Sequence, residues 1–122
     1  MGLHSVNLLY NTPMHVIKKT AFIEAAEKYA KWAVSFLDTH KALEKGNFQT
    51  PLEMQAVFPS LDNFEYKGHW YVIDIAGNKF RLIADIRFPP YHHCLYVKAI
   101  LTHPEYDDLC KKAAKKGWKG EI

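Results

Sequence analysis

The feature that most constrains the fold is an alternation of apolar and polar side chains that follows a Gly-Asn turn. Apolar side chains occupy every second position from Phe80 to Phe88, and charged ones fill most of the positions between them. A period of two residues over this length predicts a β-strand that is buried on one face. Residues 71–75 are β-branched and aromatic, and Gly77-Asn78 tolerates positive φ, so the sequence predicts a β-hairpin.

The turn also predicts which residues of the hairpin face one another. If the loop is Gly77-Asn78, then Asp74 faces Arg81 and Val72 faces Ile83. A third strand over residues 94–101 is expected to bring apolar side chains to one sheet face, namely Leu95, Val97, Ala99 and Leu101. The opposite, polar face is expected to carry Lys79, Arg81, Tyr96 and Lys98.

The other elements follow from periodicity and capping signals. Residues 14–18 predict a short edge strand. Apolar residues at helical spacing predict one amphipathic helix from Thr20 to Gly46, and if it is broken, residues 38–40 are the expected place. Thr50-Pro51-Leu52-Glu53 predicts a short second helix. Leu52, Ala56 and Val57 are expected to face inward there. A last helix is expected from near His103 to Gly117, with Leu109 and Ala113 facing inward.

This order of elements predicts an α+β fold, with helices packed on one face of a small, mainly antiparallel sheet. A chain of 122 residues is expected to form a single domain, with residues 1–13 as an N-terminal appendage. No apolar run approaches the roughly 20 residues of a membrane span. The first residues lack a signal-peptide pattern, and two cysteines do not make a disulfide scaffold. We therefore expect a cytoplasmic protein.

The positive charge is concentrated in the tail. The formal net charge is +3, while residues 111–122 alone hold five lysines against Glu121. A basic tail is typical of a partner with negative charge, and also of an ordinary solvated helix face.

Three kinds of chemistry compete on the polar sheet face. The first is cleavage of RNA without a metal, which needs cations for the phosphorane and groups that move protons. Arg81 and Lys98 can supply charge, and His103 and Tyr106 stand one turn apart at a helix start, where amide groups favour a phosphate. Each residue also has an ordinary structural interpretation: in the predicted register, Arg81 is equally explained by a cross-strand ion pair with Asp74.

The second hypothesis is a metal site built from His92, His93, Cys94 and His103. Its spacing matches no established zinc motif, and adjacent histidines do not easily reach one ion. The third is a non-catalytic module that binds nucleic acid or protein through the polar face and the lysine tail. From the residues alone, the first and third hypotheses are about equal.

Two motifs add a resemblance to a known family. These are Gly77-Asn78-x-x-Arg81-Leu82 and Thr102-His103-x-Glu105-Tyr106-Asp107, together with residues 14–19, 56–64 and 71–75. With them, residues 14–108 resemble the HigB toxins of the RelE-like superfamily. Residues 1–13 and the lysine tail lie outside the resemblance, and the lysine-rich strand segment of the superfamily has no clear counterpart.

The resemblance implies a toxin of a type II toxin–antitoxin system. Such a toxin cleaves mRNA at the A site of the ribosome, next to 16S rRNA, without a metal or cofactor. A HigA-like helix-turn-helix antitoxin neutralises it and connects it to operator DNA. The implied catalytic residues are Arg81, Lys98, His103 and Tyr106. The expected RNA-binding residues are Lys67, Lys79, Lys111 and Lys112. The alternative is a toxin of the same fold that inhibits translation by occupying the ribosome without cutting the message.

Overall fold

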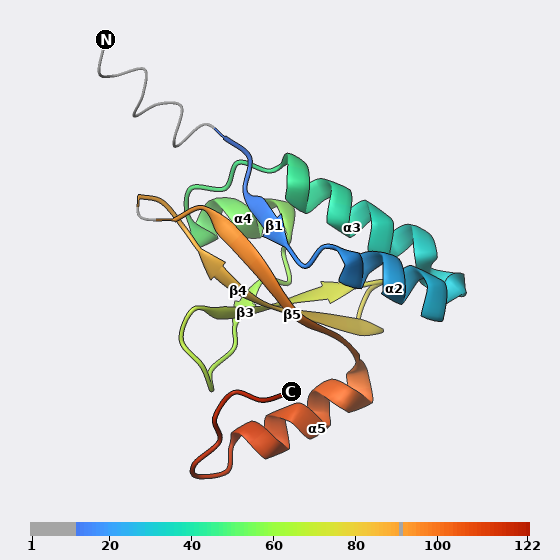
Figure 1. Cartoon of the computed structure of the whole chain (residues 1–122), viewed down its shortest axis with the longest axis vertical. Helices are drawn as coiled ribbons and strands as arrows, with labels where there is room; N and C mark the ends of the chain where they lie inside the picture. The colour runs from blue at the N-terminus through green and yellow to red at the C-terminus, as the bar shows by residue number, and fades with distance from the viewer. Residues whose placement is uncertain (1–11, 91) are drawn as a thin grey trace.

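The computed structural model describes residues 12–90 and 92–122. Its elements are β1 (His15–Ile17), α2 (Thr20–Lys28), η1 (Ala30–Trp32), α3 (Ala33–Lys45), α4 (Pro51–Val57), β2 (Asp62–Asn63), β3 (Trp70–Ile75), β4 (Phe80–Arg87), β5 (Cys94–Thr102) and α5 (His103–Ala113). The strands form one sheet in the order β1-β5-β4-β3-β2 (Figure 1). Only β1 pairs in parallel, with β5, which confirms the predicted mainly antiparallel α+β fold. Most of the predicted appendage, residues 1–11, lies outside the described residues.

The hairpin of β3 and β4 has the predicted register. Asp74 pairs with Arg81 and Val72 pairs with Ile83. The turn is longer than expected, because the strand pairing stops at Ile75 and Phe80. Positive φ falls on Ala76 (55°) and Gly77 (67°).

The main core lies on the sheet face that α2, α3 and α4 cover. Its largest side chains without solvent exposure include Phe22, Phe36 and Leu82. Burying an aromatic or aliphatic side chain of this size contributes about 1.5–3 kcal/mol each. This face holds the alternating apolar residues of β4, as their period of two predicted.

The prediction of one continuous helix over residues 20–46 is wrong. The chain breaks at Tyr29, whose φ of −118° and ψ of 63° are not helical, and not at residues 38–40. Phe22 then stacks on His40 at 5.0 Å between ring centroids, and Tyr29 lies 6.2 Å from Phe36. An unbroken helix of this length would span about 40 Å. The break lets α3 fold back beside α2, so that both helices bury apolar residues against the same sheet.

The expected inner face of α4 is also wrong. Met54 is its buried residue, whereas Leu52 and Val57 are 77% and 55% exposed and Ala56 is exposed as well. Pro51 begins the helix after the Thr50 cap, and this start turns Met54 toward the main core.

A second, smaller core lies on the opposite sheet face, which α5 covers (Figure 1). Its buried members are Phe64, Trp70, Val72, Ile83, Leu109 and Ala113. The inward positions Leu109 and Ala113 are therefore confirmed, but they pack on the face away from α2 and α3. The prediction that the helices pack on one face of the sheet is therefore wrong for α5, because Phe64, Trp70 and Val72 make the other face apolar as well. The helix ends at Ala113 rather than Gly117, which lies in the turn after it with a φ of 86°.

A β-bulge at Lys98 changes the alternation of β5. Ile83 pairs with Ala99, and the next residue, Ala84, pairs with Val97, which leaves Lys98 as the extra residue. Beyond the bulge, Leu101 packs against the second core and Ile100 against the main core. The prediction that Leu101 shares a face with Leu95 is therefore wrong.

Among residues 12–90 and 92–122, no helix is both long and apolar enough to cross a bilayer.

Candidate active site on the sheet face covered by α5

The start of α5 is held beside the start of β4 by a capping box. The Thr102 side chain accepts a hydrogen bond from the Glu105 backbone N–H at 3.3 Å, and Glu105 accepts one from the Thr102 N–H at 2.8 Å. This hydrogen bond from Thr102 lowers the pKa of the Glu105 carboxyl. The backbone N–H of His103 donates to the Lys79 carbonyl at 3.1 Å. The first turn of α5 therefore sits against the residues that precede Arg81.

Arg81 is the centre of the interactions at this junction. Its side chain is 12% exposed, and its Nε lies 3.2 Å from Asp74 Oδ1. Its Nη1 donates to the carbonyls of Asn78 at 3.0 Å and Phe80 at 3.3 Å, and its Nη2 lies 2.9 Å from His103 Nδ1. Every guanidinium nitrogen thus has a protein partner. The expected Asp74 pair is present, and it fixes the orientation of the guanidinium.

His103 is the candidate proton-transfer group closest to Arg81. Because a guanidinium only donates, His103 Nδ1 must accept its hydrogen bond. In neutral His103 the proton is then on Nε2, which lies 3.6 Å from Asp107 Oδ2. In this chain of contacts from Arg81 through His103 to Asp107, the lone pair of His103 Nδ1 faces the Arg81 guanidinium. Arg81 is the cation expected to bind the scissile phosphate.

Tyr106 completes the group from one turn further along α5. The Arg81 Cζ lies 5.7 Å from the centroid of its ring, and the Phe64 ring lies 6.4 Å away on the second core. Burial raises the pKa of the Tyr106 phenol well above its usual value, and a hydrogen bond with Cys110 raises it further. The phenol therefore stays protonated at neutral pH, where it can donate a hydrogen bond but is a poor base.

The raised pKa of Tyr106 predicts how stability depends on pH. The folded state holds the phenol proton more tightly than the unfolded chain, in which a tyrosine titrates near pH 10. Its stabilising contribution is therefore complete below about pH 10 and is lost as the pH rises above that value. Unfolding in urea between about pH 8 and pH 11 should show a smaller decline for Tyr106→Phe than for the wild type. Equal declines would contradict this assignment.

The structure does not place the other expected site residues in this group. Lys98 lies over the rings of Tyr96 and Trp70, and Lys67 also lies over Trp70. Lys79 is exposed in the hairpin turn, and Lys111 and Lys112 are exposed in the last turn of α5. Arg81, His103 and Tyr106 are thus brought together, whereas Lys98 lies in a separate cluster on the same sheet face.

The histidines of the metal hypothesis lie at opposite ends of β5. His93 precedes the strand and His103 follows it, which separates them by about 30 Å at roughly 3.3 Å per residue. Within residues 12–90 and 92–122, no three His, Cys, Asp or Glu side chains are grouped to hold a metal ion. His103 also has Arg81 and Asp107 as partners. The residues of the metal hypothesis therefore do not come together at one site.

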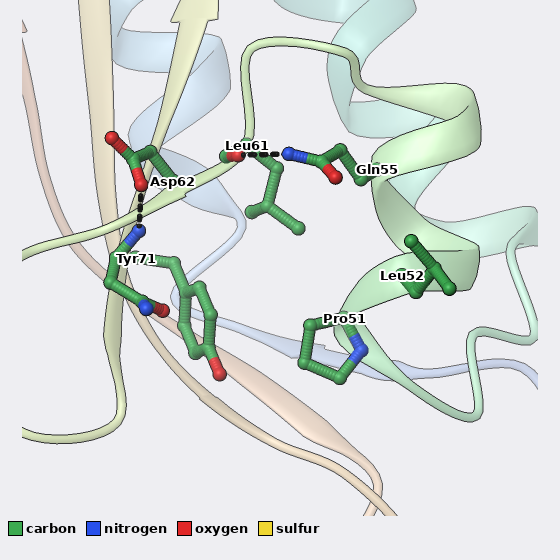
Figure 2. Close-up of a pocket in the computed structure, with 7 residues that line it drawn as sticks. Pro51, Leu52, Gln55, Leu61, Asp62 and Tyr71 are labelled. Atoms are coloured by element: carbon green, nitrogen blue, oxygen red, sulfur yellow. Dashed lines mark hydrogen bonds between the residues drawn. The ribbon is translucent and has the colours of Figure 1, made fainter.

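A pocket of about 200 Å³ lies at the sheet edge beside β2, away from Arg81 (Figure 2). It is lined by Pro51, Leu52, Gln55, Leu61, Asp62, Asn63 and Tyr71. Gln55 donates to the Leu61 carbonyl at 3.0 Å and so ties α4 to the segment before β2. No cationic side chain lines this pocket, so it does not suit a phosphate.

Sequence reasoning assigned no role to Asp107, although a signal was available. Asp107 follows His103 by four residues, which places the two side chains on one helix face. It also missed Lys18, whose ammonium lies 5.4 Å from the Tyr96 ring. No local pattern predicts that contact, because it depends on the parallel pairing of β1 with β5.

This α+β fold, with a mainly antiparallel sheet, is consistent with RelE-like toxins, and comparisons with known proteins point to the same group. The sequence profile of the HigB toxin family, described as a RelE-like toxic component of a toxin–antitoxin system, matches residues 33–109. The chain therefore belongs to the HigB toxin family.

Two relatives in Escherichia coli illustrate the similarity. In strain CFT073, the mRNA interferase HigB is 42% identical over 98 residues, which are 80% of this chain and 93% of that protein. In strain K12, the mRNA interferase toxin HigB is 38% identical over 106 residues, which are 87% of this chain and all of that protein. The likeness thus extends over nearly the whole of each relative.

Proposed function

We propose that this protein is an endoribonuclease that cleaves mRNA and so inhibits translation. The observation that carries the proposal is the contact of Arg81 with His103 beside the Tyr106 ring. Metal-free cleavage of an RNA phosphodiester needs charge stabilisation and groups that move protons, and a cation, an imidazole and a protonated phenol can supply them. Membership of the HigB family and the names of its relatives support the same activity.

The mechanism begins with an exchange of partners at Arg81. A phosphate oxygen takes over the Arg81 Nη2 hydrogen bond, which frees His103 Nδ1 to accept a proton. This nitrogen removes the proton of the ribose 2′-OH, and the 2′-oxygen attacks phosphorus. The bond from phosphorus to the 5′-oxygen breaks, and that oxygen receives a proton from Tyr106 or from water. The products carry a 2′,3′-cyclic phosphate and a 5′-hydroxyl, and Arg81 stabilises the charge on the phosphorane.

The remaining members of the expected site act on binding. In this proposal Lys98 and Lys67 make the sheet face positive, and Lys79, Lys111 and Lys112 extend the positive potential around the α5 start. The message is cut in the A site of a ribosome in the cytoplasm. A HigA-like antitoxin neutralises the toxin and links it to operator DNA, as toxin–antitoxin pairing requires a partner.

A second candidate function is favoured by the full set of partners around Arg81. A guanidinium that already contacts Asp74, two carbonyls and His103 has a structural role. If Arg81 keeps these partners when RNA binds, the protein blocks the ribosome by occupancy and the message stays intact.

The ends of the cut message test the proposed chemistry. Fragments collected after brief induction should not be extended by poly(A) polymerase until polynucleotide kinase removes the 3′-terminal phosphate. Extension without that treatment would indicate a 3′-hydroxyl and contradict attack by the 2′-oxygen. Intact message in arrested cells would instead support the occupancy function.

A further inference from the structure

A second group of cations lies on the α5 face, outside the Arg81 group. The half-buried Tyr96 ring has the Lys98 ammonium 4.5 Å from its centroid and the Lys18 ammonium 5.4 Å away. Lys98 also lies 5.5 Å from the Trp70 centroid, and Lys67 lies 5.7 Å from the same ring. We call Lys18, Lys67, Lys98, Tyr96 and Trp70 the lysine–aromatic strip.

Within residues 12–90 and 92–122, the lysines of the strip make no salt bridge, although Glu24 and Glu105 line one pocket with Lys98 and Glu65 lines another with Lys67. In the described part of the chain, none of the strip's three lysines has a carboxylate within 4 Å. The neighbouring carboxylate of Asp85 is occupied, because Arg87 Nε lies 2.7 Å from it. A ring face attracts an ammonium group but leaves its positive charge in place, so an anion that contacts these lysines would stabilise the cluster.

The backbone at Lys18 is strained in a way that supports a functional role. Its φ of 64° lies in the left-handed region, which a lysine rarely adopts. The parallel pairing of Ile17 with Tyr96 holds this position beside β5. Such strain persists where the surrounding structure imposes it, often at binding sites.

The strip lies in line with the candidate active site along β4. Tyr96 pairs with Asp85 and Leu101 pairs with Arg81, so both sites share one face of the sheet. The four residue steps from Arg81 to Asp85 correspond to about 13 Å along the strand. A single RNA strand that follows β4 would therefore meet Arg81 at one phosphate and the strip at a later one.

We propose that the lysine–aromatic strip binds the phosphodiester backbone of the message to one side of the phosphate that is cut. This inference rests on the proposed function, because it places a substrate strand at Arg81. Lys18 and Lys98 bridge one phosphate between them, and Lys67 contacts the strand beside Trp70. The strip sets the affinity for the message and takes no part in the chemical step.

Binding to an uncleavable RNA tests the strip separately from catalysis. The probe is a fluorescein-labelled 2′-O-methyl RNA of 12 nucleotides, and the full-length protein is titrated by fluorescence anisotropy at several salt concentrations. Lys18→Ala and Lys98→Ala should each weaken binding about tenfold, because each loses a charged hydrogen bond. Each should also reduce the slope of log affinity against log salt by about 1. Lys41→Ala, which removes an exposed lysine from α3 on the other face, should bind like the wild type.

A glycine variant keeps the test valid if Lys18→Ala folds poorly. Lys18→Gly removes the ammonium and relieves the positive φ, so its melting temperature should not fall while its RNA affinity does. Wild-type affinity in a folded Lys18→Gly would overturn the proposal.

Two further experiments distinguish message from ribosomal RNA as the source of the bound phosphate, and the strip from the active site. If Lys18→Ala loses sedimentation with empty 70S ribosomes but binds the 12-nucleotide RNA normally, the strip contacts ribosomal RNA, and its assignment to the message is overturned.

Message cleavage by Arg81→Ala is measured independently. A cleavage defect there with normal RNA binding by Lys18→Ala and Lys98→Ala refutes the strip alone. Normal cleavage by Arg81→Ala refutes the active-site assignment and leaves the binding result to stand by itself.

Discussion

Arg81→Ala is expected to slow message cleavage by about 100-fold, because one well-placed charge donor contributes about 3 kcal/mol of transition-state stabilisation. The guanidinium contacts both His103 and the Tyr106 ring. Its removal deletes the phosphate ligand and the partner that orients the imidazole. The rate is measured from the disappearance of a reporter message after induction.

The control for this variant is Arg87→Ala. Arg87 lies on the same strand and the same face, and it also pairs with a carboxylate, Asp85, at 2.7 Å. It has no contact with His103 or Tyr106. Arg87→Ala leaves the Asp85 carboxylate unpaired beside Tyr96, so cleavage should fall only modestly, far less than about 100-fold. Equal losses in both variants would mean that Arg81 matters only as a strand ion pair. Arg81→Lys should stay impaired, since lysine keeps the charge but lacks the planar fork.

Phe64→Ala is expected to lower the free energy of unfolding by about 3–5 kcal/mol. Phe64 is 3% exposed and is the centre of the second core. Its ring lies within 6.4 Å of the rings of Tyr66, Trp70, Trp118 and Tyr106. A cavity there loosens α5, which carries His103 and Tyr106. Urea unfolding measures the stability, and cleavage per folded molecule should fall as well.

Phe22→Ala is the matched control for this effect. Phe22 has no solvent exposure and packs in the main core, on the face away from α5. We expect a similar loss of stability, about 3–5 kcal/mol, with unchanged cleavage per folded molecule. If both variants lose cleavage equally, the second core has no particular role in positioning the site.

Local patterns in the sequence predict the hairpin and the start of α5 well. The alternation from Phe80 to Phe88 and the turn at Gly77 give the register that pairs Asp74 with Arg81. Thr102 and Glu105 predict the capping box that positions His103. These features depend on residues close together in the chain, so short-range chemistry is enough to define them.

The features that were not predicted depend on contacts between distant segments. The bulge at Lys98 changes which residues of β5 face each core. No turn residue or proline near Lys98 predicts it from the sequence. The position of α5 on the second face depends on contacts with Phe64 and Trp118. Phe64 is far from α5 in the sequence, and Trp118 lies in the tail that follows the helix. Lys98 is therefore separated from Arg81 despite their predicted common face, and Lys18 joins it through the parallel strand β1.

The most direct test of the central claim is primer extension on a reporter message after brief induction, with the wild type beside Arg81→Ala. The account predicts cuts in phase with codons in the wild type and none above background in Arg81→Ala, although both proteins are folded and present in equal amounts. Uncut message in cells that the wild type arrests would contradict the proposed nuclease. Wild-type cuts by Arg81→Ala would contradict the active site on the α5 face.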